Sequence, residues 1–146
     1  MKVFAGGTRE ITRGIIQIGG QQRRITRGLA NIGGLLKTIV SFVPPMSVSV
    51  PPFMYVSGSS NATIRIDTDV VTATVTGGKS PFTYSWALIS GFGISISNPT
   101  LASTSFSAVV GPGDTRVGTV RVTATDSLGT SRTSDIGVTI QNFSIS

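Results

Sequence analysis

The chain has 146 residues, a net charge of +6, and neither cysteine nor histidine. That length suits one ordinary domain with an appendage, since a two-sheet sandwich needs about 100 residues. The missing residue types exclude disulfides, thiolate metal sites and nucleophiles that rely on histidine as a base. Abundant Ser, Thr, Val, Ile and Gly favour strands, because β-branched side chains fit a pleated sheet. We expect an all-β protein with no enzymatic activity and no cofactor.

The positive charge lies in the first 43 residues. This segment holds seven Lys and Arg residues against Glu10 alone, which gives +6. The remaining residues balance five basic side chains with five aspartates. The uneven distribution indicates that the N-terminal segment meets an acidic partner surface.

The same segment contains a repeat of 14 residues. Ile-Thr-Arg-Gly occurs at 11–14 and again at 25–28, and Ile-Gly-Gly occurs at 18–20 and again at 32–34. Glycine supplies positive φ without a Cβ clash, which suits hairpin turns. The repeat therefore predicts a β meander with turns at its Arg-Gly and Gly-Gly positions. The expected strands span residues 8–13, 15–18, 21–27, 29–32 and 35–43.

The period also allows a coiled coil, because 14 residues make two heptads. Isoleucine and leucine follow the required spacing of four and three residues from Ile11 to Ile39, with Gln22 at one of the positions. Six glycines within that stretch would each cost a helix about 1 kcal/mol. This cost favours the meander and leaves the helix as the alternative.

A meander of short strands has no second layer to cover its apolar residues, and such a sheet alone is marginally stable in water. We therefore expect residues 1–43 to form an extended arm that docks on a partner or on copies of itself, for example as a trimer. The expected contact residues are Arg9, Arg13, Arg23, Arg24, Arg27, Lys37, Ile11, Ile18, Ile25 and Ile32.

The pattern Gly-x-Ile-x-Ile-Gly-Gly-x-x-Arg-Arg-Ile-Thr-Arg at residues 14–27 resembles short, basic, glycine-punctuated repeats of tailed-bacteriophage structural proteins. The resemblance covers residues 6–39. It implies a virion component whose arm binds the acidic surface of a capsid or tail protein.

Two Pro-Pro pairs follow the arm, within the sequence VPPMSVSVPPF at residues 43–53. Proline fixes φ, removes a backbone donor and biases the chain toward extended polyproline II. We expect residues 44–58 to be a semi-rigid linker.

Alternating apolar and polar residues begin near residue 59. Phe82, Tyr84, Trp86 and Leu88 alternate with smaller residues, and similar runs precede and follow them. Several such runs, separated by glycine-containing turns, predict a two-sheet sandwich over residues 59–143. Trp86 is expected to be the largest contributor to its core.

This region resembles the PKD-type branch of the immunoglobulin-like folds. The resemblance rests on Gly77-Gly78, on the sequence PFTYSW at residues 81–86, and on VRVTATDSLG at residues 120–129. It implies an immunoglobulin-like β-sandwich preceded by the arm. Residues 87–97 are apolar and serine-rich where related modules carry an acidic segment, so we expect no calcium site.

The leading functional expectation is a non-enzymatic bacteriophage virion protein, made in the host cytoplasm, that decorates or cements the capsid. A tail or fibre component is the nearest alternative. A carbohydrate-binding adhesion module, using residues 91–99 with Phe92, belongs to another class. No apolar run is long enough to span a membrane, and nucleic acid is not the expected partner because the arm has only Phe4 and Phe42 as aromatics.

Overall fold

The computed structural model describes residues 14–18, 21–32 and 35–146, with side chains from Val43 onward. Every regular element in these ranges is a β-strand, so the prediction of an all-β chain is confirmed, and none of the described residues forms a helix able to cross a membrane. Two compact units are present, Met1–Pro45 and Met46–Ser146. The strands are β1 (Gly14–Ile18), β2 (Gln21–Ile32), β3 (Leu35–Val43), β4 (Ser47–Ser49), β5 (Phe53–Ser59), β6 (Ile64–Asp67), β7 (Val71–Thr72), β8 (Thr74–Thr76), β9 (Thr83–Gly91), β10 (Ile94–Ile96), β11 (Ser103–Thr104), β12 (Phe106–Val110), β13 (Thr115–Thr125) and β14 (Ser131–Phe143).

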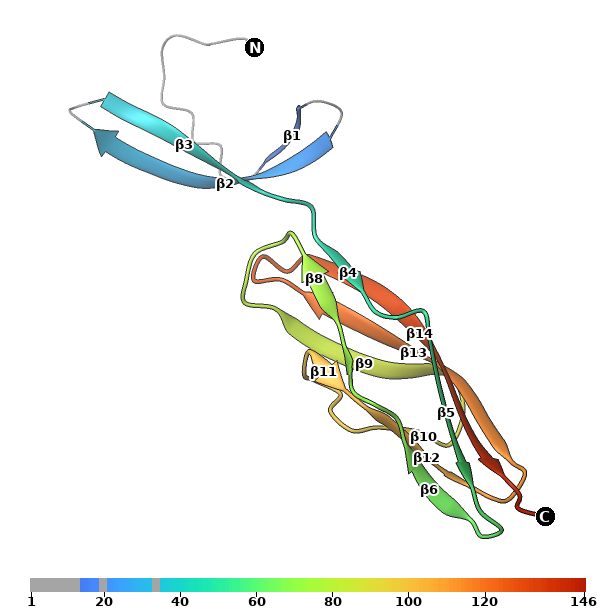
Figure 1. Cartoon of the computed structure of the whole chain (residues 1–146). Coiled ribbons are helices and arrows are strands. Elements are labelled where there is room, and N and C mark those ends of the chain that lie inside the picture. Colours follow the sequence, from blue (N-terminus) through green and yellow to red (C-terminus); the bar gives the residue numbers. More distant parts are fainter. Residues whose placement is uncertain (1–13, 19–20, 33–34) are drawn as a thin grey trace. The chain divides into compact units, whose positions relative to one another are not determined.

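The described part of the arm is one antiparallel sheet in the order β1-β2-β3 (Figure 1). Ile18 lies opposite Gln21 in the first pair, and Ile32 lies opposite Leu35 in the second. Each glycine pair of the repeat therefore falls between two paired strands. The coiled-coil alternative is wrong for these residues, because all of them are extended and paired.

One predicted turn of the arm is wrong. A turn was expected at Arg27-Gly28, but β2 continues through both residues. Gly28 lies opposite Ile39 in the ladder between β2 and β3. A single glycine weakens a strand without ending it, so only the glycine pairs separate strands here. The strand expected at residues 8–13 lies outside the described residues.

The second unit contains two main sheets (Figure 1). One has four strands in the order β5-β14-β13-β9, and the other has three in the order β10-β12-β6. Two short ladders, β11-β7 and β4-β8, complete the unit. The apolar residues of the two main sheets form one buried cluster, so the sheets are two layers around a common core.

Burial in the second unit follows the two-residue period of its strands. In β14, Ile136, Val138 and Ile140 are fully buried, while the residues between them are partly exposed. In β13, Val120, Val122 and Ala124 behave in the same way. The alternation read from the sequence thus identifies the core-facing residues of both central strands.

Trp86 lies in the core, as predicted. Its side chain is 4% exposed, and its ring meets that of Phe106 edge to face with centroids 6.1 Å apart. The indole Nε1–H donates a hydrogen bond of 2.8 Å to the carbonyl oxygen of Leu101. Burial and a satisfied donor together make Trp86 a structural residue rather than a ligand platform.

The prediction of a linker at residues 44–58 is wrong. Both β4 and β5 lie within it, and β5 pairs in parallel with β14, with Phe53 opposite Gly137. Met46 is 5% exposed, so the folded unit begins directly after Pro45. The run Phe53-Met54-Tyr55-Val56 is apolar on both faces and follows two prolines, so the sequence lacks here the two-residue period that marks the other strands.

The turn between β13 and β14 is organised by Asp126. One carboxylate oxygen accepts hydrogen bonds from the backbone N–H groups of Leu128 at 2.9 Å and Thr130 at 2.8 Å. The other oxygen accepts one from the N–H of Lys79 at 3.3 Å. Gly129 has a φ of 79°, which a residue without Cβ adopts freely. The carboxylate therefore joins this turn to the loop that precedes β9.

Candidate interaction surfaces

The arm residues predicted to contact a partner are only partly within the described chain. Arg9, Ile11 and Arg13 lie outside it. The remaining seven are distributed over all three strands of the arm sheet. They are Ile18 on β1, Arg23, Arg24, Ile25, Arg27 and Ile32 on β2, and Lys37 on β3.

One face of the arm sheet combines two arginines with two isoleucines. Alternate residues of a strand share a face, and so do directly opposed residues of paired strands. Arg23, Ile25 and Arg27 therefore belong to one face. Ile18 belongs to it as well, because it lies opposite Gln21.

The other face carries the remaining contact residues. Arg24 and Ile32 occupy the alternate positions of β2. Lys37 lies opposite Ala30 and shares their face. Basic and apolar residues are thus mixed on both faces, and the sheet has no separate charged side and apolar side.

The sequence repeat corresponds to a repeated hairpin with one register. Gly14 lies opposite Ile25, and 14 residues later Gly28 lies opposite Ile39. The turn-proximal pairs follow the same shift, from Ile18 opposite Gln21 to Ile32 opposite Leu35. Each copy of the repeat therefore forms an equivalent antiparallel hairpin, and the two hairpins share one sheet.

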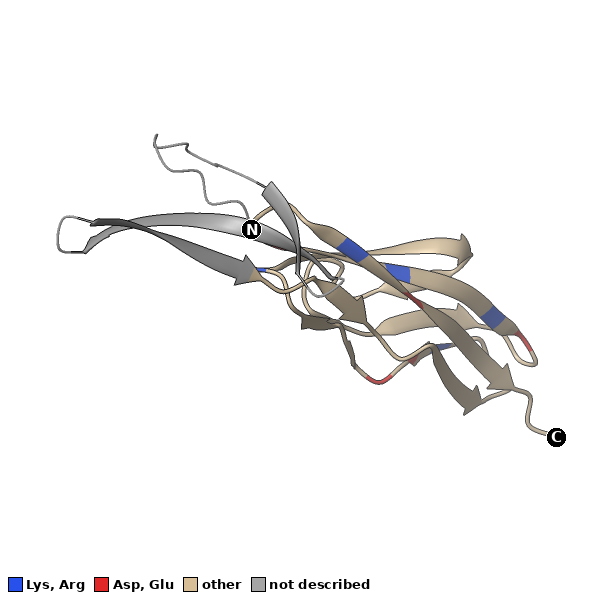
Figure 2. Cartoon of the chain, turned by 90° about the horizontal axis from the view of Figure 1, so that it is seen from above, with Lys and Arg blue, Asp and Glu red and all other residues tan. Residues whose placement is uncertain are grey.

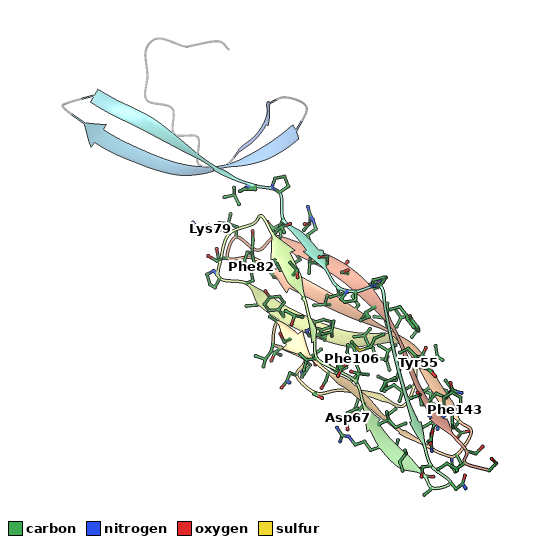
Figure 3. The ribbon with its side chains drawn as sticks, viewed as in Figure 1. Tyr55, Asp67, Lys79, Phe82, Phe106 and Phe143 are labelled. Carbon is green, nitrogen blue, oxygen red and sulfur yellow. The ribbon has the colours of Figure 1, made fainter. Side chains whose placement is uncertain are left out.

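An exposed apolar surface lies on the outer face of the four-stranded sheet. It consists of Phe53 and Tyr55 on β5, Val117 on β13 and Phe143 on β14, which are 58%, 48%, 62% and 45% exposed. Tyr55 and Phe143 lie along β5 and β14, whereas Phe106 lies inside the unit (Figure 3). We call these four residues the aromatic surface. The sequence prediction missed it because β5 was assigned to a linker.

Two contacts fix the rings of the aromatic surface. Phe53 lies over Gly137, where an added Cβ would be 3.3 Å from the Phe53 Cδ2 atom. The Tyr55 hydroxyl donates a hydrogen bond of 3.1 Å to Oε1 of Gln141. Thr139 lies between Tyr55 and Val117 in register, so the surface has amide and hydroxyl groups among its apolar side chains and no charge.

A single ion pair occupies another part of the same sheet face. The Arg121 guanidinium donates two hydrogen bonds, of 2.7 and 2.8 Å, to the carboxylate oxygens of Asp135. These bonds lower the pKa of Asp135 from its ordinary value and raise the pKa of Arg121. Both side chains are exposed, so the pair contributes little stability.

The segment at residues 91–99, which was expected to contact glycans and which includes β10, exposes one aromatic ring. Phe92 is 71% exposed, and the guanidinium carbon of Arg116 lies 5.4 Å from its ring centroid. Arg116 also approaches Asp114, with a nitrogen-to-oxygen distance of 4.0 Å. One face of the Phe92 ring is therefore engaged by a cation, which leaves a smaller aromatic platform here than on β5.

Charged residues elsewhere in the second unit are scattered over its strands and loops (Figure 2). The carboxylate of Asp67 accepts hydrogen bonds of 2.8 to 3.2 Å from the guanidinium of Arg65. Over the described ranges no group of three or more His, Cys, Asp or Glu side chains gathers to hold a metal ion. The candidate surfaces are therefore the arm sheet and the aromatic surface.

Neither a protein-family model nor a curated protein matches the chain. A solved structure, a nucleoside hydrolase-related hypothetical protein from Saccharophagus degradans that is associated with carbohydrate metabolism, is 18% identical with a TM-score of 0.44. The match covers 69% of this chain and 26% of that chain, so this chain spans about a quarter of its length. A similarity at this level supports no inference about function.

Proposed function

We propose that the chain is a non-enzymatic structural protein of a bacteriophage virion, made in the host cytoplasm. The arm anchors it to an acidic surface of a capsid or tail protein, and the second unit is displayed outward. Capsid decoration is the leading assignment, and a tail or fibre component is the alternative. The bacteriophage assignment rests on the resemblance of the arm repeat.

The observation that carries the anchoring role is the composition of the arm sheet. Its described strands form a single layer, and isoleucines and basic residues occur on both faces. A single layer cannot bury apolar residues by itself, whereas a partner surface or a second layer can. The basic residues add attraction to an acidic surface, which favours protein over the phosphate backbone because the isoleucines also become buried.

We further propose that the second unit is an immunoglobulin-like sandwich of the PKD type. Its four-stranded and three-stranded sheets share one core, which suits that architecture. Two residues add support, because each lies in a stretch of sequence on which the resemblance rests. Trp86 of β9 is buried in the core, and Asp126 holds the turn between β13 and β14.

Labelling the chain after residue 146 and imaging purified phage particles tests the location. We expect regularly spaced label over the capsid. Label confined to the tail would support the alternative and reject capsid decoration. Particles that lack the chain altogether, by label and by mass spectrometry, would contradict a virion role.

The aromatic surface favours a second candidate function, binding of a neutral polysaccharide by the displayed unit. Three exposed rings, from Phe53, Tyr55 and Phe143, lie on the outer sheet face beside an amide and hydroxyl groups, apart from the Arg121–Asp135 ion pair of that face. Rings pack against the apolar faces of sugars, and amides and hydroxyls hydrogen-bond their hydroxyl groups. The full chain should be retained on insoluble polysaccharides. Loss of this retention in Phe53→Ala, together with normal retention of Val70→Ala, would support polysaccharide binding. Equal behaviour of both variants would reject it.

A further inference from the structure

The arm sheet ends in a long, weakly charged edge. Within the described residues β3 pairs with β2 alone, and none of these residues forms a strand against its other edge. Its nine residues, LLKTIVSFV, contain one charge, Lys37, and no proline. An apolar edge strand of this length presents unpaired N–H and C=O groups and is a template for a further strand.

The repeated hairpin indicates which strand fits that edge. Each copy of the repeat forms its own antiparallel hairpin with the same register, with Gly14 opposite Ile25 in the first copy and Gly28 opposite Ile39 in the second. An antiparallel strand from a second copy of this chain therefore continues the pairing direction that the sheet already uses. Pro44 and Pro45 follow β3 directly and lack N–H groups, so pairing cannot extend beyond Val43.

We propose that β3 pairs antiparallel with β3 of a second copy, around a two-fold axis at Ile39. The inference deepens the proposed anchoring function and rests on it. Ile39 is the central residue of the nine, so this register leaves no residue of either strand unpaired. Leu35 then lies opposite Val43, and Lys37 opposite Ser41, in a continuous sheet of six strands.

The charge of the arm is compatible with this pairing. The two-fold register sets each Lys37 against a serine rather than against the other lysine. In the joined sheet the central strands follow the order β2, β3, β3 of the second copy, β2 of the second copy. The two β2 strands, which carry the arginines, are therefore three strand spacings apart, about 14 Å. That distance exceeds the Debye length of about 8 Å at physiological ionic strength. Pairing should therefore depend weakly on salt, unlike attachment to an acidic surface.

A cysteine scan of the full chain tests the register, because the chain contains no cysteine of its own. Directly opposed residues of an antiparallel pair have Cα atoms about 4.5–5.5 Å apart, within the range of a disulfide. Ile39→Cys should therefore give a covalent dimer under mild oxidation. Val40→Cys is the matched control, because the two copies of this residue would be about 8 Å apart, beyond that range.

We expect most of Ile39→Cys, and little of Val40→Cys, to migrate as a dimer on a non-reducing gel. Sedimentation of the unmodified chain should give a dimer mass that persists as salt is raised. A monomer mass, or equal cross-linking of the two variants, would overturn the two-fold pairing. Attachment to particles is measured separately and should be lost at high salt, so a failure of the anchoring proposal can be distinguished from a failure of this one.

Discussion

The ring of Phe53 lies against the backbone of Gly137 on the strand beside it. A Cβ placed on Gly137 would be 3.3 Å from Cδ2 of Phe53, closer than an ordinary contact, and 3.7 Å from the carbonyl oxygen of Pro52. Glycine at this position therefore allows an exposed ring to lie close to the sheet. The pair defines one end of the aromatic surface.

Gly137→Ala should displace the Phe53 ring without unfolding the chain. The ring is exposed and can move, and alanine has less backbone entropy to lose than glycine, so we expect stability to change by less than about 1 kcal/mol. If the second unit binds polysaccharide, the variant should lose retention to the same extent as Phe53→Ala. Urea unfolding and retention measurements check the two parts. A loss of several kcal/mol would show that the site is more tightly packed than the contacts indicate.

Trp86→Ala should be strongly destabilising. The residue is buried against Phe106, and truncation of a buried tryptophan costs about 3–5 kcal/mol. Trp86→Phe should cost less, about 1–3 kcal/mol, because it keeps the apolar contact but leaves the carbonyl of Leu101 without its donor. Urea unfolding of the full chain followed by circular dichroism measures both, with Phe92→Ala as the exposed control. A midpoint for Trp86→Ala equal to that of the control would contradict the core assignment.

Asp126→Ala should destabilise the turn between β13 and β14. It removes the carboxylate that accepts from the part-buried N–H groups of Leu128, Thr130 and Lys79, and hydrogen bonds to a charged group contribute about 1.5–3 kcal/mol. Asp126→Asn should cost less, because its amide oxygen can still accept from the first two. Hydrogen exchange at these amides reports the local effect. Equal exchange rates in the wild type and Asp126→Ala would be inconsistent with this role.

The Arg121–Asp135 pair should give a small stability contribution that depends on pH. Hydrogen bonding to Arg121 lowers the pKa of Asp135 in the folded state, so the contribution is present at neutral pH and is lost as pH falls through that lowered value. Unfolding of wild type and Asp135→Asn should differ slightly at pH 7 and converge in acid. A difference that grows on acidification would contradict the assigned direction.

The strands could be predicted from the sequence wherever apolar and polar residues alternate without interruption by proline or glycine. Alternation identified Trp86 and the buried residues of β13 and β14, and the glycine pairs located the ends of the arm strands. The prediction failed where proline or single glycine dominated the interpretation. Pro51-Pro52 led to a linker where β5 lies, and Gly28 led to a turn inside β2, because pairing with a neighbouring strand decides both positions and pairing is not a local property.

The aromatic surface could not be predicted for the same reason. Phe53 and Tyr55 are two residues apart, which places them on one strand face, but their association with Val117 and Phe143 requires the parallel pairing of β5 with β14. Such long-range pairings are set by the whole fold. The mixed faces of the arm sheet likewise follow from the register of β2 rather than from the repeat alone.

Retention on purified phage particles tests the anchoring role most directly. The test variant reverses three charges of β2 by combining Arg23→Glu, Arg24→Glu and Arg27→Glu. The control variant reverses three charges of the second unit by combining Arg65→Glu, Arg121→Glu and Arg132→Glu. We predict that the first triple variant stays folded but is lost from particles during sedimentation, whereas the second, if folded, remains bound. Undiminished attachment of the β2 variant would contradict an arm that anchors the chain through its basic sheet.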